Sequence, residues 1–97
     1  MATVFVDGEN VRRSVWPNVP REELEALAEA WAAAHGHEVV VVWETEISAD
    51  DWIAANAGAH RPYWLVTSDR ELRRRAGGDA ERVVGGGSFA RDLKTKA

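Results

Sequence analysis

Short apolar runs alternate with amphipathic segments along the chain. The runs at 4–6, 39–43 and 63–67 are rich in β-branched and aromatic residues, which predicts strands buried on both faces. A shorter stretch at 82–84 predicts a fourth strand. Strands that alternate with helices favour parallel pairing through right-handed crossovers. We therefore expect a single three-layer α/β domain over residues 1–97, with helices on both sides of a small parallel sheet.

The segments between these runs carry helix signals. Pro20 suits the first turn of a helix, and Gly36 suits its left-handed end. We also expect one helical turn at 11–15 and a last short helix over about 88–93. Between Pro20 and Gly36 an apolar stripe follows helical spacing at Leu24, Leu27, Ala28, Trp31 and Ala34.

Two capping boxes mark further helix starts. In the first, Ser48 is the expected cap, Asp51 stands at the third helical position, and the helix runs to about Ala57. In the second, Ser68 is the expected cap and Glu71 stands at the third helical position. Both helices therefore begin a few residues after a predicted strand.

The composition fits a globular domain without disulfides. Hydrophobic residues make up 45% of the 97 positions and cysteine is absent, so neither disulfides nor thiolate metal sites can form. No basic stretch leads into a long apolar run, and no run reaches the length of a membrane span. We therefore expect a cytoplasmic protein with no membrane partner.

Charge is spread unevenly along the chain. Residues 1–60 hold 11 acidic and 3 basic side chains, a balance of −8, whereas residues 61–97 hold 5 acidic and 9 basic ones, a balance of +4. The simpler interpretation is a solvated surface with unevenly placed arginines. A basic half beside an acidic one could also guide a phosphate chain.

Carboxylates stand where ligands bind in open α/β sheets, at the carboxyl ends of the strands. Asp7 and Asp69 each follow a predicted strand, and Asp50 and Asp51 open a helix that starts on the same edge. Clustered carboxylates repel one another and need a proton or a cation to be tolerated. Oxygen ligands suit Mg²⁺ or Mn²⁺, which can activate water and neutralise charge on a phosphodiester.

Each of these carboxylates also has a structural interpretation. Asp50, Asp51 and Asp69 could simply stabilise the starts of their helices. Asp7 has no such local duty, because it ends a buried strand in front of Gly8. The glycine run at 85–87 could bind an anion before the last helix, but it lacks the lysine of a P-loop, and a flexible turn explains it better. The histidines are better explained as solvated side chains at His35, His37 and His60.

Three short motifs stand at these strand ends and helix starts. They are Val-Asp-Gly-Glu-Asn at 6–10, Ser-Ala-Asp-Asp-Trp-Ile at 48–53 and Leu-Val-Thr-Ser-Asp-Arg at 65–70. In this order they resemble the NYN-type branch of the PIN-like nucleases, near its YacP-like bacterial members. The Gly-Gly-Ser-Phe run at 86–89 resembles the C-terminal element of that family, so the resemblance spans nearly the whole chain.

The resemblance implies a parallel sheet with an acidic site that holds Mg²⁺ or Mn²⁺ and cuts RNA. The catalytic set that it implies is Asp7, Asn10, Asp50 and Asp69, where Asn10 would orient a water or a ligand. The metal would be held by Asp7, Asp50 and Asp69, with Asp51 as a fourth ligand or an outer partner.

The chain departs from the family pattern after the second predicted strand. Family members usually carry a longer segment there, with a further acidic-glycine turn and an extra short strand. Here only four residues separate Trp43 from Ser48. We therefore expect a four-stranded sheet in the order 2-1-3-4 and a more open site. One acidic ligand is then missing, unless Glu44 or Glu46 substitutes for it.

The resemblance makes metal-dependent phosphodiester hydrolysis of RNA the leading hypothesis. Phosphate contacts would come from four arginines, of which Arg70 matches a basic residue often found beside the family's aspartate. Two other hypotheses stay open: a non-catalytic RNA-binding or protein-interaction module, and a metal-dependent phosphatase for a small substrate. The exposed edges of a small sheet could also pair two copies into a homodimer. The four arginines are Arg12, Arg13, Arg70 and Arg74.

Overall fold

A sheet of four parallel strands carries helices on both of its faces. The computed structural model describes residues 1–95 and shows the strands β1 (Thr3–Asp7), β2 (Glu38–Val42), β3 (Tyr63–Val66) and β4 (Arg82–Val84). The helices are α1 (Gly8–Arg12), α2 (Arg21–His35), α3 (Ala49–Asn56), α4 (Arg70–Ala76) and α5 (Gly86–Thr95), and a 3-10 turn η1 (Ala57–His60) follows α3. Residues 96 and 97, the last two of the expected domain, lie outside the described part.

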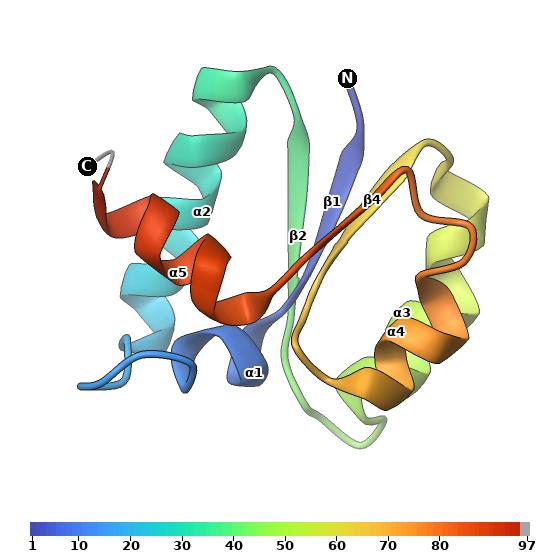
Figure 1. Cartoon of the computed structure of the whole chain (residues 1–97), viewed down its shortest axis with the longest axis horizontal. Helices are drawn as coiled ribbons and strands as arrows, with labels where there is room; N and C mark the ends of the chain where they lie inside the picture. The colour runs from blue at the N-terminus through green and yellow to red at the C-terminus, as the bar shows by residue number, and fades with distance from the viewer. Residues whose placement is uncertain (96–97) are drawn as a thin grey trace.

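The strand order β2-β1-β3-β4 confirms the expected topology. β1 lies in the interior of the sheet, with Val6 opposite Val41 of β2 and Val66 of β3. β4 is short and pairs only with β3, where Val83 stands opposite Leu65. Because all pairs are parallel, the carboxyl ends of the strands share one edge of the sheet (Figure 1).

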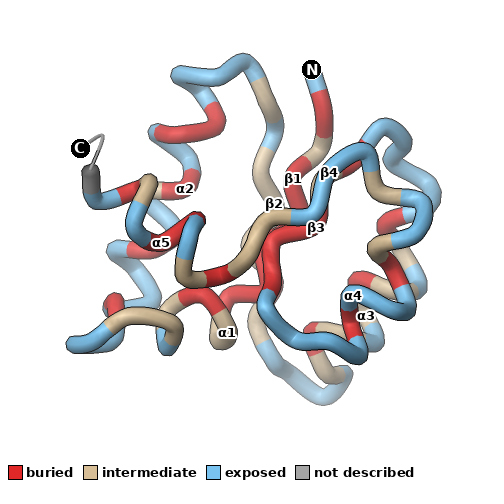
Figure 2. The backbone as a smooth tube through the Cα atoms, in the orientation of Figure 1, coloured by how far each residue is buried: buried red, intermediate tan, exposed pale blue. Residues whose placement is uncertain are grey.

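Alternating side chains of the strands fill two separate cores, one on each face. Helices α1, α2 and α5 cover one face, and α3 and α4 cover the other (Figure 1). Val4 and Val6 of β1 pack with Leu24, Trp31 and Phe89 in the first core. The second core includes Phe5, Ile53, Tyr63, Leu65 and Leu72. The tube in Figure 2 shows the resulting buried stretch along β1 and β3, which confirms the three-layer expectation.

The long helix α2 matches its sequence signals at both ends. It begins directly after Pro20 and ends at Gly36, whose φ of 72° lies in the left-handed region that glycine tolerates. Leu24, Ala28 and Trp31 of the expected stripe are buried, whereas Ala34 is exposed. Within residues 1–95, no helix is both long and apolar enough to cross a membrane.

The starts of two helices, α4 and α5, differ from the sequence expectations. Ser48 caps α3 as expected, because its Oγ accepts a hydrogen bond from the N–H of Asp51 at 3.3 Å. The expected cap Ser68 is wrong: Asp69 caps α4, and the Ser68 hydroxyl instead accepts from the N–H of Gly86. The last helix starts at Gly86 rather than Ser88, so the glycine run is partly helical.

The other two differences concern α1 and the end of α3. The turn expected at 11–15 lies earlier, over Gly8–Arg12, so the chain enters a helix immediately after Asp7. α3 ends at Asn56, next to the expected end at about Ala57, and the 3-10 turn η1 continues the chain to His60. The early start of α1 brings Asn10 back toward the carboxyl edge of the sheet.

Gly8 is tightly packed, which yields a stability prediction. A Cβ built on Gly8 would lie 2.6 Å from ring atoms of Trp43, which crosses over this turn from the end of β2. We expect Gly8→Ala to lower the free energy of unfolding by about 1–3 kcal/mol, the usual cost of an overpacked site. Chemical denaturation followed by circular dichroism measures this change.

Gly58 provides the matched control for this substitution. A Cβ on Gly58 would meet nothing within 4 Å, and its φ is not positive. Gly58→Ala should therefore leave stability within about 0.5 kcal/mol of wild type or raise it slightly. Equal losses in the two variants would contradict the steric account of Gly8.

Candidate functional site

Asp7 is the buried carboxylate of the sheet edge. It is the last residue of β1, it is only 8% exposed, and its Oδ2 accepts a hydrogen bond from the Thr67 hydroxyl at 3.0 Å. Thr67 directly follows β3 and is fully buried. The neighbouring strands β1 and β3 therefore hold this carboxylate through one side-chain hydrogen bond.

Burial raises the pKa of Asp7 above its ordinary value. Hydrogen bonds from Thr67 and from the backbone N–H of Asn10 lower this pKa in part, and the negative charges of Asp69 and Asp50 raise it further. A carboxylate whose charge is opposed by burial and by like charges gains most from a nearby cation. Groups with perturbed pKa values are frequent at functional sites.

Asp69 is linked to Asp7 through Thr67. The backbone N–H of Asp69 donates to the Thr67 hydroxyl oxygen at 3.1 Å, and the same hydroxyl donates to Asp7. The Oδ1 of Asp69 accepts from the backbone N–H groups of Glu71 at 2.8 Å and Leu72 at 3.4 Å, which fixes the side chain at the start of α4. Asp69 is thus a helix cap and a neighbour of the buried carboxylate at the same time.

Asn10 joins three segments of the chain at this edge. Its Oδ1 accepts from the backbone N–H of Ser68 at 2.8 Å, and the Ser68 hydroxyl accepts from the N–H of Gly86 at 2.8 Å. Gly86 has no room for a side chain, because a Cβ would lie 2.6 Å from Oδ1 of Asn10. The amide of Asn10 therefore holds the loop after β3 against the start of α5.

A pocket of about 360 Å³ opens at this carboxyl edge. Asp7 and Asp69 both line it, and both were expected at this edge of the sheet. Glu44, named above as a possible substitute ligand, lines it as well, and Arg13 is the cation on its wall. Glu9 and Asn10 of α1 also line this pocket.

Asp50 and Asp51 lie at the start of α3 and form ion pairs with α4. Arg75 Nη1 lies 2.7 Å from Oδ1 of Asp51 and 3.6 Å from Oδ2 of Asp50. The hydrogen bond from Arg75 lowers the pKa of Asp51. Asp50 is close enough to raise the pKa of Asp7, but the side chains that line the pocket do not include either residue of this pair.

The residues fit a divalent cation through oxygen ligands rather than through a complete protein cage. Within residues 1–95 no group of three or more His, Cys, Asp or Glu side chains is close enough together to hold a metal ion. Mg²⁺ commonly binds through only one or two carboxylates and completes its shell with water and substrate phosphate. Asp7 and Asp69, which share one pocket, can supply that pair.

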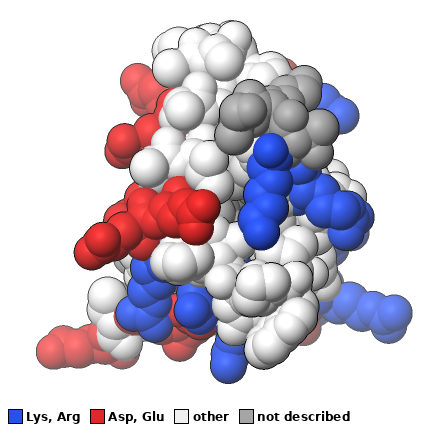
Figure 3. All heavy atoms as spheres, turned by 90° about the vertical axis from the view of Figure 1, so that its left-hand side faces the viewer, with Lys and Arg blue, Asp and Glu red and all other residues white. Residues whose placement is uncertain are grey.

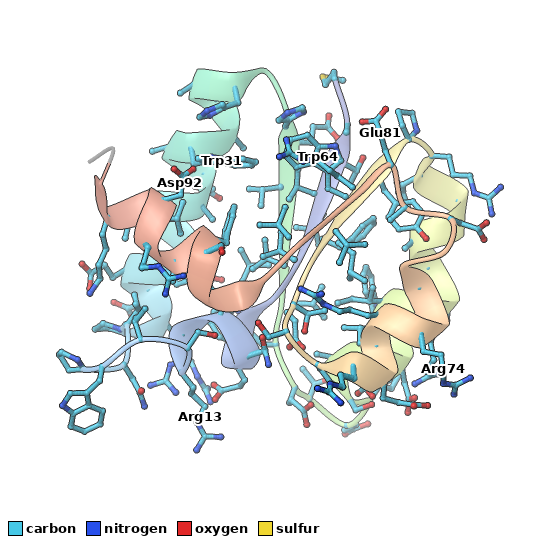
Figure 4. All side chains as sticks on the ribbon, viewed as in Figure 1. Arg13, Trp31, Trp64, Arg74, Glu81 and Asp92 are labelled. Atoms are coloured by element: carbon cyan, nitrogen blue, oxygen red, sulfur yellow. The ribbon has the colours of Figure 1, made fainter. Side chains whose placement is uncertain are left out.

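The four candidate arginines have different surroundings. Arg13 is 69% exposed in its side chain, lines the pocket and forms an ion pair with Glu9 at 3.9 Å. Arg12 donates to Glu9 and to the carbonyl oxygen of Val19. Arg74 pairs with Glu71 on α4, and Figure 4 shows it on the outer side of that helix, far from Arg13. Arg70 is exposed in the first turn of α4.

Two residues at this edge were missed as site residues. Thr67 bridges the aspartates, and its position between a buried strand and Ser68-Asp69 was the signal that could have found it. Arg73 was not considered for the site, and its Nε–H donates to the carbonyl oxygen of Thr67 at 2.9 Å. One turn of α4 separates Arg73 from Asp69, so helical spacing alone could have placed it near that edge.

Searches of protein-family models, of curated proteins and of solved structures found no significant match to this chain.

The raised pKa of Asp7 predicts how stability depends on pH. Ionisation of Asp7 is less favourable in the folded protein than in the unfolded chain, so the wild type loses stability as pH rises through the folded pKa. Asn at this position cannot ionise and can still accept from Thr67. In metal-free buffer at pH 7, Asp7→Asn should therefore raise the free energy of unfolding, by about 1.4 kcal/mol for each unit of the pKa rise.

Denaturant melts at intervals of about one pH unit between pH 3 and pH 8 check this prediction. The stability difference between Asp7→Asn and wild type should shrink as pH falls toward the ordinary Asp value of 3.8. Asp79→Asn is the control, because Asp79 is exposed and pairs only with exposed Arg61. A stability loss for Asp7→Asn at pH 7 would contradict the burial argument.

Asp69 allows its cap to be separated from its charge. Asp69→Ala removes the acceptor for the N–H groups of Glu71 and Leu72 and should cost about 1 kcal/mol of unfolding free energy. Asp69→Asn keeps a good cap and removes only a negative charge near Asp7, so it should be neutral or stabilising without metal. Equal losses in both variants would show that the charge itself supports the fold.

Proposed function

We propose that this chain hydrolyses phosphodiester bonds of RNA at the carboxyl edge of the sheet, with Mg²⁺ or Mn²⁺ as cofactor. The observation that carries this proposal is the buried carboxylate of Asp7, linked by Thr67 to Asp69 in one open pocket. One carboxylate at the end of β1 and one that follows the neighbouring strand β3 supply oxygen ligands at a position where open α/β sheets bind substrates.

The residues of the chain have separate roles in this proposal. Asp7 and Asp69 hold the cation, and Glu44 lies on the same pocket wall as a further oxygen donor. The bound ion would neutralise charge on the phosphate and activate water. Thr67 orients the Asp7 carboxylate, and Asn10 keeps the loop after β3 in place. Asp50 acts through its charge on Asp7, and Asp51 remains an outer partner.

The charge distribution supports an RNA strand at this edge rather than along α2. Figure 3 shows acidic side chains mainly on its left side and basic ones on the right and towards the bottom. Helix α2 carries the exposed glutamates Glu22, Glu23, Glu25 and Glu29. Arg13 is the cation at the carboxylate pocket, and Arg70 is exposed at the start of the helix that Asp69 caps. Contacts of this kind position a phosphate backbone without reading its sequence.

A second candidate function is a non-catalytic module that binds RNA or a protein. The pairing of Asp50 and Asp51 with Arg75 favours it, because these carboxylates are then engaged by a cation of the chain itself. β2 and β4 are the outer strands of the sheet, so a homodimer through one of these edges belongs to the same proposal.

Metal binding is tested by thermal melting of the wild type with Mn²⁺ or Mg²⁺. A ligand that binds only the folded state at ten times its dissociation constant adds about 1.4 kcal/mol of stability. For a domain of this size that is a rise of several degrees in Tm. Asp7→Asn should lose most of this rise, although it is the more stable protein without metal. Asp79→Asn should keep the full rise, since Asp79 stands away from the pocket in its pair with Arg61.

Cleavage of a labelled single-stranded RNA tests the reaction. We expect slow cutting with Mn²⁺ and none in EDTA. Arg13→Glu should weaken RNA binding at low salt, and the difference from wild type should shrink as salt rises, because fewer counterions are released. Arg61→Glu is the matched control, because Arg61 precedes β3 and so stands at the opposite edge of the sheet.

The outcomes distinguish the candidate functions. RNA binding without metal-dependent cleavage would support the non-catalytic module. Hydrolysis of a small phosphate monoester without cleavage of RNA would support a phosphatase. A melting temperature that does not change with either metal, together with no cleavage, would overturn the proposed nuclease.

A further inference from the structure

A second pocket, of about 350 Å³, lies beside α5. It is formed between α2, α5 and the strands β3 and β4, and it shares no lining residue with the carboxylate pocket. Its volume is in the lower part of the range of roughly 300–1,000 Å³ that holds small ligands. Its wall includes Trp31, Trp64, Arg82, Ser88, Phe89 and Asp92.

Aromatic rings form the apolar part of this wall. The ring centroids of Trp31 and Phe89 are 5.0 Å apart at an angle of 77°, and Trp64 lies 6.0 Å from Trp31. His35, one turn further along α2, stacks on Trp31 at 4.9 Å. Figure 4 shows Trp31 and Asp92 on the facing helices α2 and α5, and Trp64 of β3 packs against the same core. Such a set of rings suits a flat ligand with its own π surface.

The polar part of the wall carries both signs of charge. The guanidinium carbon of Arg82 lies 5.0 Å from the ring centroid of Trp64, and Asp92 is half-buried on α5. Trp64 is held in place because its Nε1–H donates to Glu81 at 2.9 Å. The Nε1–H of Trp31 is buried and has no acceptor among the described residues. A ligand for this pocket should therefore offer an acceptor or an anion to one part of the wall and a donor to another.

We propose that this pocket binds the base of a nucleotide. The base would pack among Trp31, Trp64 and Phe89, and its exocyclic amine would donate to the carboxylate of Asp92. The nucleotide phosphate would meet Arg82 at the mouth of the pocket. Stacking on aromatic rings and an amine hydrogen bond to a carboxylate are recurrent contacts of nucleobases with proteins.

Other ligand classes fit the same wall less well. A purely apolar ligand would bury Asp92 and Arg82 beside it without new hydrogen bonds, which is unfavourable. An organic cation could pair with Asp92 but would be repelled by the Arg82 guanidinium on the same wall. A nucleotide meets both charges and the rings together.

The base could belong to a free mononucleotide or to an RNA strand. The first turn of α5 connects the two pockets. Ser88 lines this pocket, and Gly86 lies against Asn10 of the carboxylate pocket. An RNA strand could thus place one base here. Base binding at this pocket does not depend on the metal or on cleavage, so EDTA is present throughout the test.

The test follows the indole N–H signals of the full-length protein by NMR during titration with nucleotides. AMP, CMP and GMP carry an exocyclic amine on the base, and UMP does not. We expect the indole signals of Trp31 and Trp64 to shift with the first three, which should bind more tightly than UMP by roughly tenfold, the effect of one hydrogen bond to a charged group. A short oligoribonucleotide that shifts the same signals when mononucleotides do not would assign the base to an RNA strand.

Two variants probe the polar contacts without disturbing the rings. Asp92→Ala should remove the preference for amine-bearing bases. Arg82→Gln should reduce the advantage of a nucleotide over its nucleoside by roughly tenfold and leave nucleoside binding nearly unchanged. Trp16→Phe is the control, because Trp16 is 88% exposed in the loop before α2 and its loss should change neither binding nor the other signals. Circular dichroism melts establish that each variant is folded.

Three results would overturn the proposal. One is the absence of any shift at Trp31 and Trp64 with millimolar nucleotides and with the oligoribonucleotide. Another is equal binding of phenyl phosphate and the nucleotides, which would show that the base edge is not recognised. The third is an unchanged base preference in folded Asp92→Ala. Because Asp7→Asn should bind nucleotides here as wild type does, a failed nuclease assay and a failed pocket remain distinguishable.

Discussion

The central position of β1 determines most of this structure. Its side chains alternate between two cores, with Val4 and Val6 on one face and Phe5 on the other, so both faces of the strand are covered. The next residue, Asp7, is therefore delivered to the sheet edge while still largely buried. A carboxylate in that position needs a hydrogen-bond donor, and Thr67 of the adjacent chain segment supplies it. The geometry of the candidate site thus depends on the register between β1 and β3.

The fold could be predicted because its signals are local and consistent. Apolar runs, a terminal glycine at Gly36 and the cap at Ser48 each indicate the element that forms there. The cap of α4 could not be assigned in the same way, because two residues in a row, Ser68 and Asp69, can both accept hydrogen bonds from a helix start. The contact of Ser68 with Gly86 decides between them, and that contact joins segments 18 residues apart.

The candidate site could be predicted only in part. Asp7 and Asp69 meet because both follow parallel strands, and that rule needs no side-chain detail. The ion pairs of Asp50 and Asp51 with Arg75 arise because α3 and α4 pack side by side on one face of the sheet. Sequence spacing within either helix cannot show a contact between helices. The aromatic pocket was missed for the same reason, since Trp31 and Trp64 come from a helix and a strand far apart in the chain.

Because the domain is small, several of its residues have both a structural role and a role in a pocket. Asp69 ends the loop after β3 as a helix cap and lines the carboxylate pocket. Gly86 lets Asn10 approach, and it opens the helix that carries Phe89 and Asp92 to the second pocket. A change at such a position alters stability and binding together, because the same hydrogen bonds and contacts serve both. Residues that line only one pocket, such as Arg13 and Arg82, therefore separate function from folding more cleanly than the residues that join the segments.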